Sequence, residues 1–263
     1  MNGQRRFDGQ TAIVTGASLG LGRSIAERFA AEGAHVLLTG RDAERLQTAV
    51  AEIDADGGEV AAVPGDVSDP EAAERTVAFA LERWGRVDVL VNNAGIYDSD
   101  GFLEQSFEDW SYVIGVLLSG PFLMGQRAAR AMVAGGRGGS IVNIASIDGH
   151  GADGPYAGYG AAKGGLIALT KYMAVAVAPH GVRANSVSPG YIDTPMIASL
   201  GETYDLMKTN FERVPLGRMI EPGEVAALTA FLASSEAAAI TGTDHVIDGG
   251  TLADLHIFPT LES

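Results

Sequence analysis

The sequence predicts an α/β fold with a doubly wound, seven-stranded parallel sheet and helices on both faces. Short apolar runs rich in β-branched residues alternate with longer stretches of helical spacing, such as Leu21, Ile25 and Phe29. A glycine-rich turn directly follows the first run, and no repeat, low-complexity segment or change of composition marks a linker. Strands that alternate with helices favour a parallel sheet covered on both faces. We therefore expect one domain over residues 1–263.

The elements follow in order along the chain. Trp110, Val113 and Leu117 share one apolar helix face in the middle of the chain. The predicted strands are the runs TAIVT (11–15), AHVLLT (34–39), EVAAV (59–63), VDVLV (87–91), SIVNIA (140–145), VRANSV (182–187) and DHVID (244–248).

Composition excludes several classes of function. The 263 residues include no cysteine, so disulfides, thiolate nucleophiles and thiolate metal sites are ruled out. Five histidines without metal-ligand spacing predict no metal site. A net charge of −15 argues against a nucleic-acid partner. The longest apolar run, LIALTKYMAVAVA, is interrupted by Lys171, and the N-terminus lacks a signal-type segment, so we expect a cytoplasmic protein without a membrane partner.

The glycine-rich turn TGASLGLG spans residues 15–22, with glycines at 16, 20 and 22. A turn of this kind between a strand and a helix lets a dinucleotide pyrophosphate approach the helix N-terminus. The spacing is G-x-x-x-G-x-G and not the G-x-G-x-x-G of many dehydrogenases. Glycines also permit tight packing of a helix on a sheet, so a purely architectural role stays open for this stretch alone.

Further motifs follow in a fixed order: NNAG (92–95), Ser146, YGAAK (159–163), SPGYIDT (188–194) and TGTDHVIDGG (241–250). Together with the glycine turn, they resemble the short-chain dehydrogenase/reductase family over nearly the whole chain. The resemblance implies a Rossmann-type catalytic domain, a nicotinamide cofactor, and hydride exchange with a small-molecule carbonyl or alcohol substrate.

Tyr159 and Lys163 are the candidate catalytic pair. They are four residues apart in a helical stretch, so their side chains meet on one face. An ammonium nearby favours the phenolate, which would bring the tyrosine pKa down towards a useful range for proton transfer. The Ser146 hydroxyl would bind the same substrate oxygen while negative charge develops on it.

Each of these residues also has a structural interpretation. Tyr159 fits ordinary helix packing, and Lys163 fits a solvated helix charge. Tyr156 is a useful comparison because Gly160 stands where its lysine would be, so we interpret it as a wall or structural residue. The family resemblance favours the catalytic interpretation of Ser146, Tyr159 and Lys163.

Leu117 departs from the family pattern. The resemblance implies an asparagine at this position that helps to relay protons through water to the lysine. Leucine continues the apolar face of Trp110 and Val113 and supplies no amide. Two hypotheses follow: an enzyme with another proton path, or a cofactor-binding protein with weak or no turnover that acts as a sensor or assembly partner.

The end of the second predicted strand bears on cofactor choice. A carboxylate there favours NAD, whereas an arginine pairs with the 2′-phosphate of NADP. Gly40 stands at the carboxylate position, and Arg41 follows it, so NADP is predicted, with NAD as the alternative. Asp42 is a candidate ribose ligand or helix N-cap. Leu19 lacks the basic charge found in the glycine turn of many NADP-using relatives.

The resemblance also implies the remaining cofactor contacts. Asp66 would lie beside the adenine, unless it only caps the helix near Pro70. The predicted cofactor-binding residues are Gly16, Ser18, Leu19, Gly20, Leu21, Gly22, Arg41, Asp66, Val67, Asn93, Ala94, Gly95, Tyr159, Lys163, Pro189, Gly190, Ile192 and Thr194.

The substrate segment is expected at about residues 191–220, where apolar and charged residues mix. Its apolar members fit either a pocket wall or core packing. His150, on a loop with Asp148 and Asp153, is a candidate contact for a polar substrate, although loop histidines are commonly solvated. The candidate wall residues are Met196, Leu200, Leu206 and Phe211.

Assembly is also an inference from the resemblance. Relatives commonly assemble through the helices that here span about 107–133 and 156–178, so a homotetramer or homodimer is expected. The tail carries Leu255, Ile257 and Phe258, which suit docking on a neighbour or over the chain's own cleft.

Overall fold

The computed structural model describes residues 5–55, 59–98, 100–152, 154–198, 201–209 and 211–254. Its sheet has seven parallel strands, as predicted. Their order in the sheet is β3-β2-β1-β4-β5-β6-β7. Predicted strand limits differ from the observed ones by at most two residues. The strands are β1 (Thr11–Thr15), β2 (His35–Gly40), β3 (Glu59–Pro64), β4 (Val89–Asn92), β5 (Gly139–Ile144), β6 (Val182–Pro189) and β7 (Asp244–Ile247).

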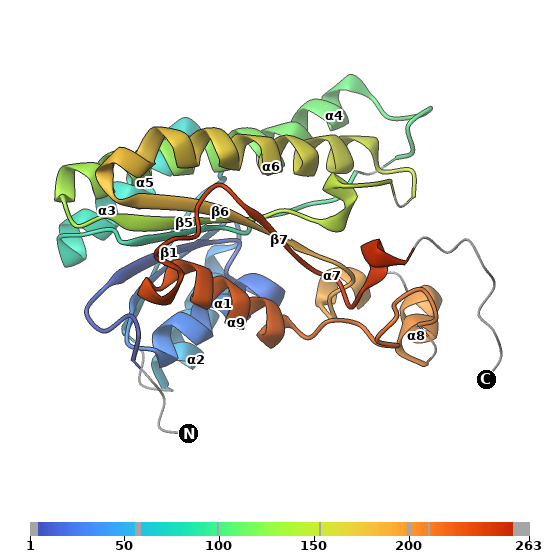
Figure 1. Cartoon of the computed structure of the whole chain (residues 1–263), viewed down its shortest axis with the longest axis horizontal. Helices are drawn as coiled ribbons and strands as arrows, with labels where there is room; N and C mark the ends of the chain where they lie inside the picture. The colour runs from blue at the N-terminus through green and yellow to red at the C-terminus, as the bar shows by residue number, and fades with distance from the viewer. Residues whose placement is uncertain are drawn as a thin grey trace.

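Helices cover both faces of the sheet, with α3, α5 and α6 on one side and α1, α2 and α9 on the other (Figure 1). A π-helical turn, Gly115–Ser119, joins α4 to α5. The helices are α1 (Gly20–Ala31), α2 (Ala43–Ala55), α3 (Pro70–Trp84), α4 (Phe107–Ile114), α5 (Gly120–Gly135), α6 (Ala157–Val177), α7 (Pro195–Ala198), α8 (Glu202–Thr209) and α9 (Pro222–Ala233).

The strand β1 shows how the two layers form. Its side chains alternate between the faces of the sheet, as the pleat requires. Ala12 and Val14 pack in the core under α1 and α9, whereas Ile13 packs in the core under α3 and α5. Burial on both faces explains why the strands appear in the sequence as continuous apolar runs rather than as alternating ones.

The order of the strands reverses at β1, which pairs with β2 on one side and with β4 on the other. The connections that leave β1 and β4 therefore run to opposite halves of the sheet. In open α/β sheets this arrangement leaves a crevice at the carboxyl ends of the strands, where ligands bind. The glycine turn after β1 and the NNAG turn after β4 both lie at this point.

One helical stretch, Ala157–His180, is long and apolar enough by composition to span a membrane, with a mean hydropathy of 1.3. The sequence expectation placed no such stretch here, because Lys171 interrupts the run. In the fold, α6 packs on β5 and β6. It is therefore a core helix of the sheet, and its first turns carry Tyr159 and Lys163.

The segment after β6 forms α7 and α8, which lie beyond the carboxyl end of β6, at the right of Figure 1. Phe211 packs in a small apolar cluster with Met207 and Val214, so the core interpretation is correct for this residue. Leu200 and the side chains of Met196 and Leu206 lie outside the described residues, as does the tail with Leu255, Ile257 and Phe258.

Candidate active site and cofactor cleft

The glycine turn is built both for packing and for a ligand. Gly16 has a φ of 64°, and a Cβ there would lie 2.7 Å from the Cα of Ala94, so its role is architectural. Gly20 also has positive φ, 58°, but a Cβ there would meet only Thr194 and Pro195 at ordinary contact distances. Leu19, the N-cap of α1, makes no side-chain cap. The first N–H groups of α1 are left for a ligand, which fits a pyrophosphate.

The NNAG turn is tied to the end of β1. The hydroxyl of Thr15 accepts hydrogen bonds from the backbone N–H groups of Asn93 (2.9 Å) and Ala94 (3.0 Å). The side-chain amide of Asn93 donates to the carbonyls of Thr15 and Gly16 at 3.0 and 3.3 Å. These bonds fix the spacing of the two turns, so Asn93 shapes the cleft through its side chain.

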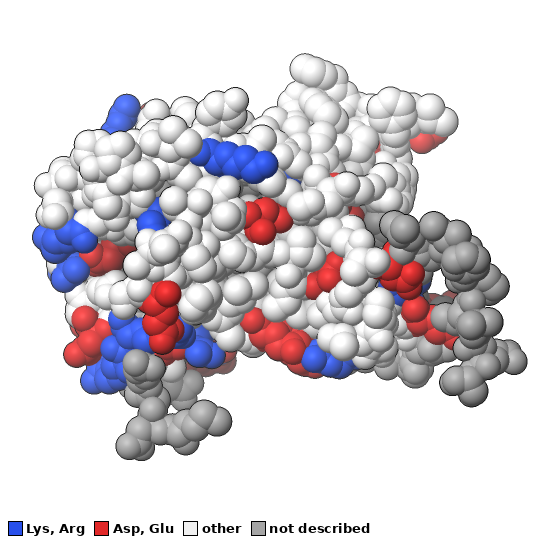
Figure 2. All heavy atoms as spheres, in the orientation of Figure 1, with Lys and Arg blue, Asp and Glu red and all other residues white. Residues whose placement is uncertain are grey.

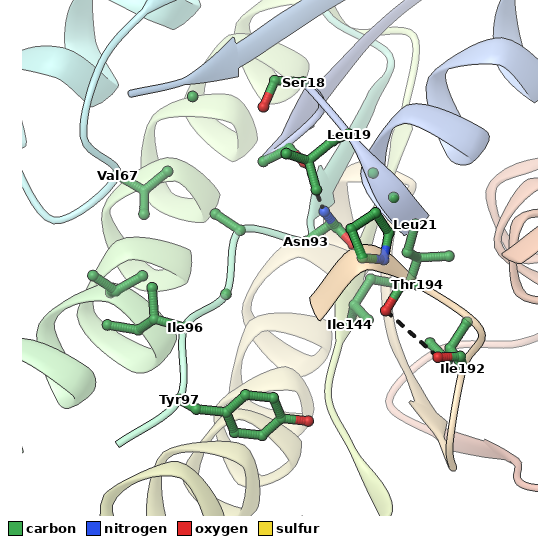
Figure 3. A pocket seen from close by; sticks show the side chains of 18 of the residues that line it. Ser18, Leu19, Leu21, Val67, Asn93, Ile96, Tyr97, Ile144, Ile192 and Thr194 are labelled. Atoms are coloured by element: carbon green, nitrogen blue, oxygen red, sulfur yellow. Dashed lines mark hydrogen bonds between the residues drawn. The ribbon is translucent and has the colours of Figure 1, made fainter. Parts of the chain in front are cut away.

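A cavity of about 1020 Å³ opens between these turns and the start of α6 (Figure 3). Ser146 and every residue that the sequence predicts to bind the cofactor line this cavity. Lining residues outside that prediction are Gly40, Asp42, Arg45, Gly65, Ile96, Tyr97, Val116, Ile144, Ala145, Pro195 and Ile197. The size and lining suit a dinucleotide together with a small substrate.

Ser146, Tyr159 and Lys163 come together at one end of the cavity. Ser146 follows β5, and its hydroxyl acts on that of Tyr159, whose pKa it lowers. The Nζ of Lys163 lies 5.4 Å from the centroid of the Tyr159 ring. It donates a 2.7 Å hydrogen bond to the carbonyl of Ile144, the last residue of β5. The Ser146 oxygen also accepts the N–H of Asp148 at 3.1 Å, which fixes the turn after the strand.

The electrostatics differ from the sequence expectation. Burial raises the pKa of the Tyr159 hydroxyl well above its usual value, and Tyr97 and Asp148 act in the same direction. The Ser146 hydroxyl lowers this pKa, but burial outweighs it. Burial also lowers the pKa of Lys163 to about 8. The expectation that the lysine brings down the tyrosine pKa is wrong for this structure, because the ammonium points to a backbone carbonyl and both groups are buried.

Two further tyrosines lie beside Tyr159. The ring of Tyr97 packs on it with centroids 4.6 Å apart, and Tyr156 packs on Tyr97 at 5.5 Å. Tyr97 lines the cavity, whereas Tyr156 is not among the lining residues and so agrees with a structural role. Tyr97 is not among the site residues predicted from the sequence, although it is the second residue after the NNAG turn.

At the other end of the cavity, β2 ends at Gly40. Arg41 is exposed, and its guanidinium donates to the hydroxyl of Tyr112 on α4. The carboxylate of Asp42 accepts the N–H of Arg45 at 3.0 Å and also pairs with its guanidinium at 3.1 Å. Asp42 therefore acts as a cap of α2, and two arginines stand at this end of the cavity.

Asp66 does not cap the helix that follows it. The cap of α3 is Asp69, whose carboxylate accepts the N–H groups of Glu71 and Ala72. Asp66 instead accepts hydrogen bonds from the backbone N–H and the hydroxyl of Ser68, at 2.9 and 2.6 Å. The alternative interpretation of Asp66 as a cap is thus wrong, and the residue lines the cavity.

Leu117 lies in the π-helical turn and is buried in the core beside Val113, as its apolar pattern predicts. Its Cδ2 lies 3.7 Å from the position that a Cβ on Gly95 would take. An apolar side chain therefore packs against the NNAG turn, and it offers no group that carries a proton.

His150 does not point to the substrate end. Its Nε2 lies 2.8 Å from the carboxylate of Asp244 on β7 and 3.3 Å from the hydroxyl of Ser188 on β6. These partners hold the ring against the sheet, so the structure does not support the suggested contact with a polar substrate. Asp153, on the same loop, lies outside the described residues.

Comparison with known proteins decides the family. A family model described as enoyl-(acyl carrier protein) reductase matches residues 16–251. A meso-2,3-butanediol dehydrogenase from Serratia marcescens is 40% identical over 248 residues, which cover 94% of this chain and 96% of that protein. The chain belongs to the short-chain dehydrogenase/reductase family. It is an NAD(P)-dependent oxidoreductase that exchanges a hydride between nicotinamide and a ketone or secondary alcohol.

Solved structures of this family share the fold. A short-chain type dehydrogenase/reductase from Mycobacterium marinum superposes with a TM-score of 0.90 at 37% identity, covering 95% of this chain and 98% of that one. A gluconate 5-dehydrogenase from Burkholderia cenocepacia, solved with NADP and tartrate, gives 0.89 at 30% identity, covering 96% and 99%. These relatives are named as dehydrogenases, and the hypothesis of a cofactor-binding protein without turnover gains no support from them.

Proposed function

We propose that this protein is an NADP-preferring dehydrogenase or reductase in which Ser146, Tyr159 and Lys163 carry out proton transfer on a small ketone or secondary alcohol. The observation that carries the proposal is their convergence in the cavity that the glycine turn opens. We propose that the whole chain acts as one catalytic domain, since the seven strands that the structure describes pair in one sheet.

The residues at the cavity fit a dinucleotide. The open N-terminus of α1 suits the pyrophosphate, and the absence of a side chain at Gly20, where φ is positive, suits its close approach. Asp66 and Val67 would hold the adenine, and Ile192 and Thr194 would face the nicotinamide. When bound, the nicotinamide supplies or accepts the hydride.

Proton transfer would be the task of the three side chains. In reduction, the Tyr159 hydroxyl gives its proton to the substrate oxygen while Ser146 donates a hydrogen bond to the same oxygen. A high tyrosine pKa keeps this proton in place at neutral pH, which suits an acid. In oxidation, the Tyr159 oxygen takes the proton from the hydroxyl of the alcohol. Lys163 lies on the same face of α6 and holds positive charge next to this group.

The preference for NADP rests on the far end of the cavity. Gly40 presents no carboxylate to a ribose, Asp42 is used as a helix cap, and Arg41 and Arg45 supply two guanidinium groups. Guanidinium groups pair with phosphates in a bidentate way, which favours a 2′-phosphate. A relative in the same fold was solved with NADP.

We also propose that the protein is a homotetramer or homodimer. Large apolar side chains are exposed along α4, α5 and α6, namely Phe107, Tyr112, Phe122, Tyr172 and Val175. Figure 2 shows few charged side chains over α4, in contrast to the opposite edge of the molecule. Such surfaces are typical of interfaces. Light scattering tests this proposal: we expect a multimer whose mass falls towards one chain in Val175→Asp, and a wild-type monomer would contradict it.

The cytoplasmic location and the absence of nucleic-acid and membrane partners remain predictions, which cell fractionation and filter binding would test. The central experiment follows the consumption of NADPH and NADH in parallel with a panel of ketones and secondary alcohols, including acetoin and 2,3-butanediol. We expect turnover with NADPH in preference to NADH. Turnover with NADH alone would overturn the NADP assignment, and binding of both cofactors without any turnover across a broad panel would overturn the catalytic one.

A further inference from the structure

The Tyr159 hydroxyl needs a route by which its proton reaches water. Tyr159 is only 9% exposed, and Lys163, the cation beside it, is 4% exposed. The Lys163 ammonium donates to the carbonyl of Ile144, and a carbonyl has no proton to pass on. Leu117 packs at the NNAG turn with an apolar side chain. These four residues therefore provide no path to the solvent.

Tyr97 is the proton-carrying side chain that joins Tyr159 to the open part of the cavity. Its ring packs on the Tyr159 ring with centroids 4.6 Å apart, and its hydroxyl raises the pKa of the Tyr159 hydroxyl. Tyr97 is 36% exposed, four times the exposed fraction of Tyr159. In Figure 3 its hydroxyl points away from its own backbone and into the cavity.

The backbone holds this contact in place. Asp98, the next residue in the chain, is buried, and its carboxylate accepts the N–H of Tyr159 at 3.2 Å. A Cβ on Gly158 would lie 2.6 Å from the other oxygen of Asp98, so only glycine allows this approach. The segment that carries Tyr97 is thereby fixed against the first turn of α6, which keeps the two phenol rings near each other.

We propose that Tyr97 passes the proton between Tyr159 and the solvent. This inference rests on the proposed function, since it concerns the same site. In reduction, the carbonyl carbon gains a hydride, the O–H bond of Tyr159 breaks, and the substrate oxygen gains that proton. The Tyr159 phenolate then takes a proton from the Tyr97 hydroxyl, and Tyr97 takes one from water. Oxidation runs the same transfers in reverse.

The groups around Tyr159 and Tyr97 decide which of the two tyrosines holds the proton. Asp148 faces the site from the turn after β5, and its carboxylate disfavours an anion on Tyr159. Asp98 adds a second carboxylate from the loop after β4, whereas Lys163 is the cation on α6. Burial and the Asp148 carboxylate both disfavour negative charge on Tyr159, so the charge is better placed on the more exposed Tyr97, and the proton returns to Tyr159 after each exchange.

The test compares wild type with Tyr97→Phe, Leu117→Asn and the double variant. Tyr156→Phe is the matched control, because Tyr156 also packs on Tyr97 but is not among the cavity-lining residues. We expect Tyr97→Phe to lower kcat roughly 10-fold or more, with KM nearly unchanged and a larger solvent deuterium isotope effect. Leu117→Asn should restore much of kcat in the double variant. An unchanged kcat, or a change in KM alone, would overturn the proposal.

A second readout does not depend on turnover. Tyrosinate absorbance is titrated in wild type, Tyr97→Phe, Tyr159→Phe and the variant with both changes. Hydroxyls that exchange a proton titrate as a coupled pair, so the effects of the two single changes should not add. Additive curves would overturn the proposal. If wild type turned over no substrate, the proposed function would fail, and this titration would still decide whether the two hydroxyls are coupled.

Discussion

The two ends of the cavity are built in different ways. At the catalytic end, Ser146, Tyr159 and Lys163 are buried and joined to one another or to a strand carbonyl. At the ribose end, Arg41 and Arg45 are exposed and make surface contacts with Tyr112 and with Asp42. Buried groups act with full electrostatic strength, whereas exposed charges are screened by water. Changes at the catalytic end should therefore have large effects on kcat, and changes at the ribose end moderate effects on KM.

Tyr159→Phe should have the largest effect, because it removes the group that carries the proton. We expect kcat to fall by about 10²- to 10⁴-fold, while cofactor affinity changes little. Initial rates and quenching of protein fluorescence by NADPH measure the two quantities. A variant that keeps more than about a tenth of the wild-type kcat would mean that another group donates the proton.

The rates of reduction and of oxidation should change with pH in opposite senses. Reduction needs the proton on Tyr159, and burial raises the pKa of that hydroxyl, so the reduction rate should be constant at neutral pH and fall only at alkaline pH. Oxidation needs a base on the same residue, so its rate should rise over that alkaline range. Lys163, whose pKa burial lowers to about 8, loses its charge before Tyr159 loses its proton, so both changes should lie above that pH. Profiles with the same sign in both directions would contradict this account.

At the ribose end, Arg41→Ala should raise KM for NADPH by about 10-fold and leave KM for NADH nearly unchanged. Gly40→Asp should shift the preference towards NADH. A side chain fits at that position, because the nearest atom to a Cβ on Gly40 is Leu46 Cδ2 at 3.9 Å. Steady-state kinetics with both cofactors provide the measurement, with Arg45→Ala as the comparison. Equal effects on both cofactors would show that Arg41 does not contact the 2′-phosphate.

The smallest effect is expected for Asp42→Ala, which removes the cap of α2. It should lower the free energy of unfolding by about 1 kcal/mol and leave kcat unchanged. Urea denaturation and initial rates measure these values. A loss of NADPH affinity without a loss of stability would instead place Asp42 on the ribose.

Much of this molecule follows from the sequence because its patterns are local. Apolar runs define the strands, and the four-residue spacing of Tyr159 and Lys163 places them on one face of α6. Features that depend on distant partners could not be predicted. The role of Tyr97 arises because β4 ends beside the start of α6, and His150 meets Asp244, which is 94 residues away.

The sign of the Tyr159 pKa shift was also beyond the sequence. Spacing shows that a lysine is close, but it does not show how deeply both groups are buried or where the ammonium points. Burial acts on the tyrosine more strongly than any single neighbour, and only the packed structure reveals it. The cap of α3, in contrast, could have been found from the sequence, because Asp69 directly precedes Pro70, and proline is common at the first position of a helix.

The central claim is that hydride and proton are exchanged with a carbonyl at Ser146, Tyr159 and Lys163. The most direct test uses NADPH deuterated on the nicotinamide carbon that donates the hydride, with a ketone from the active panel and mass spectrometry of the alcohol. Wild type should place one deuterium on the carbinol carbon, and Tyr159→Phe should form almost none of this product. An alcohol without deuterium, or equal labelling by both proteins, would contradict the account.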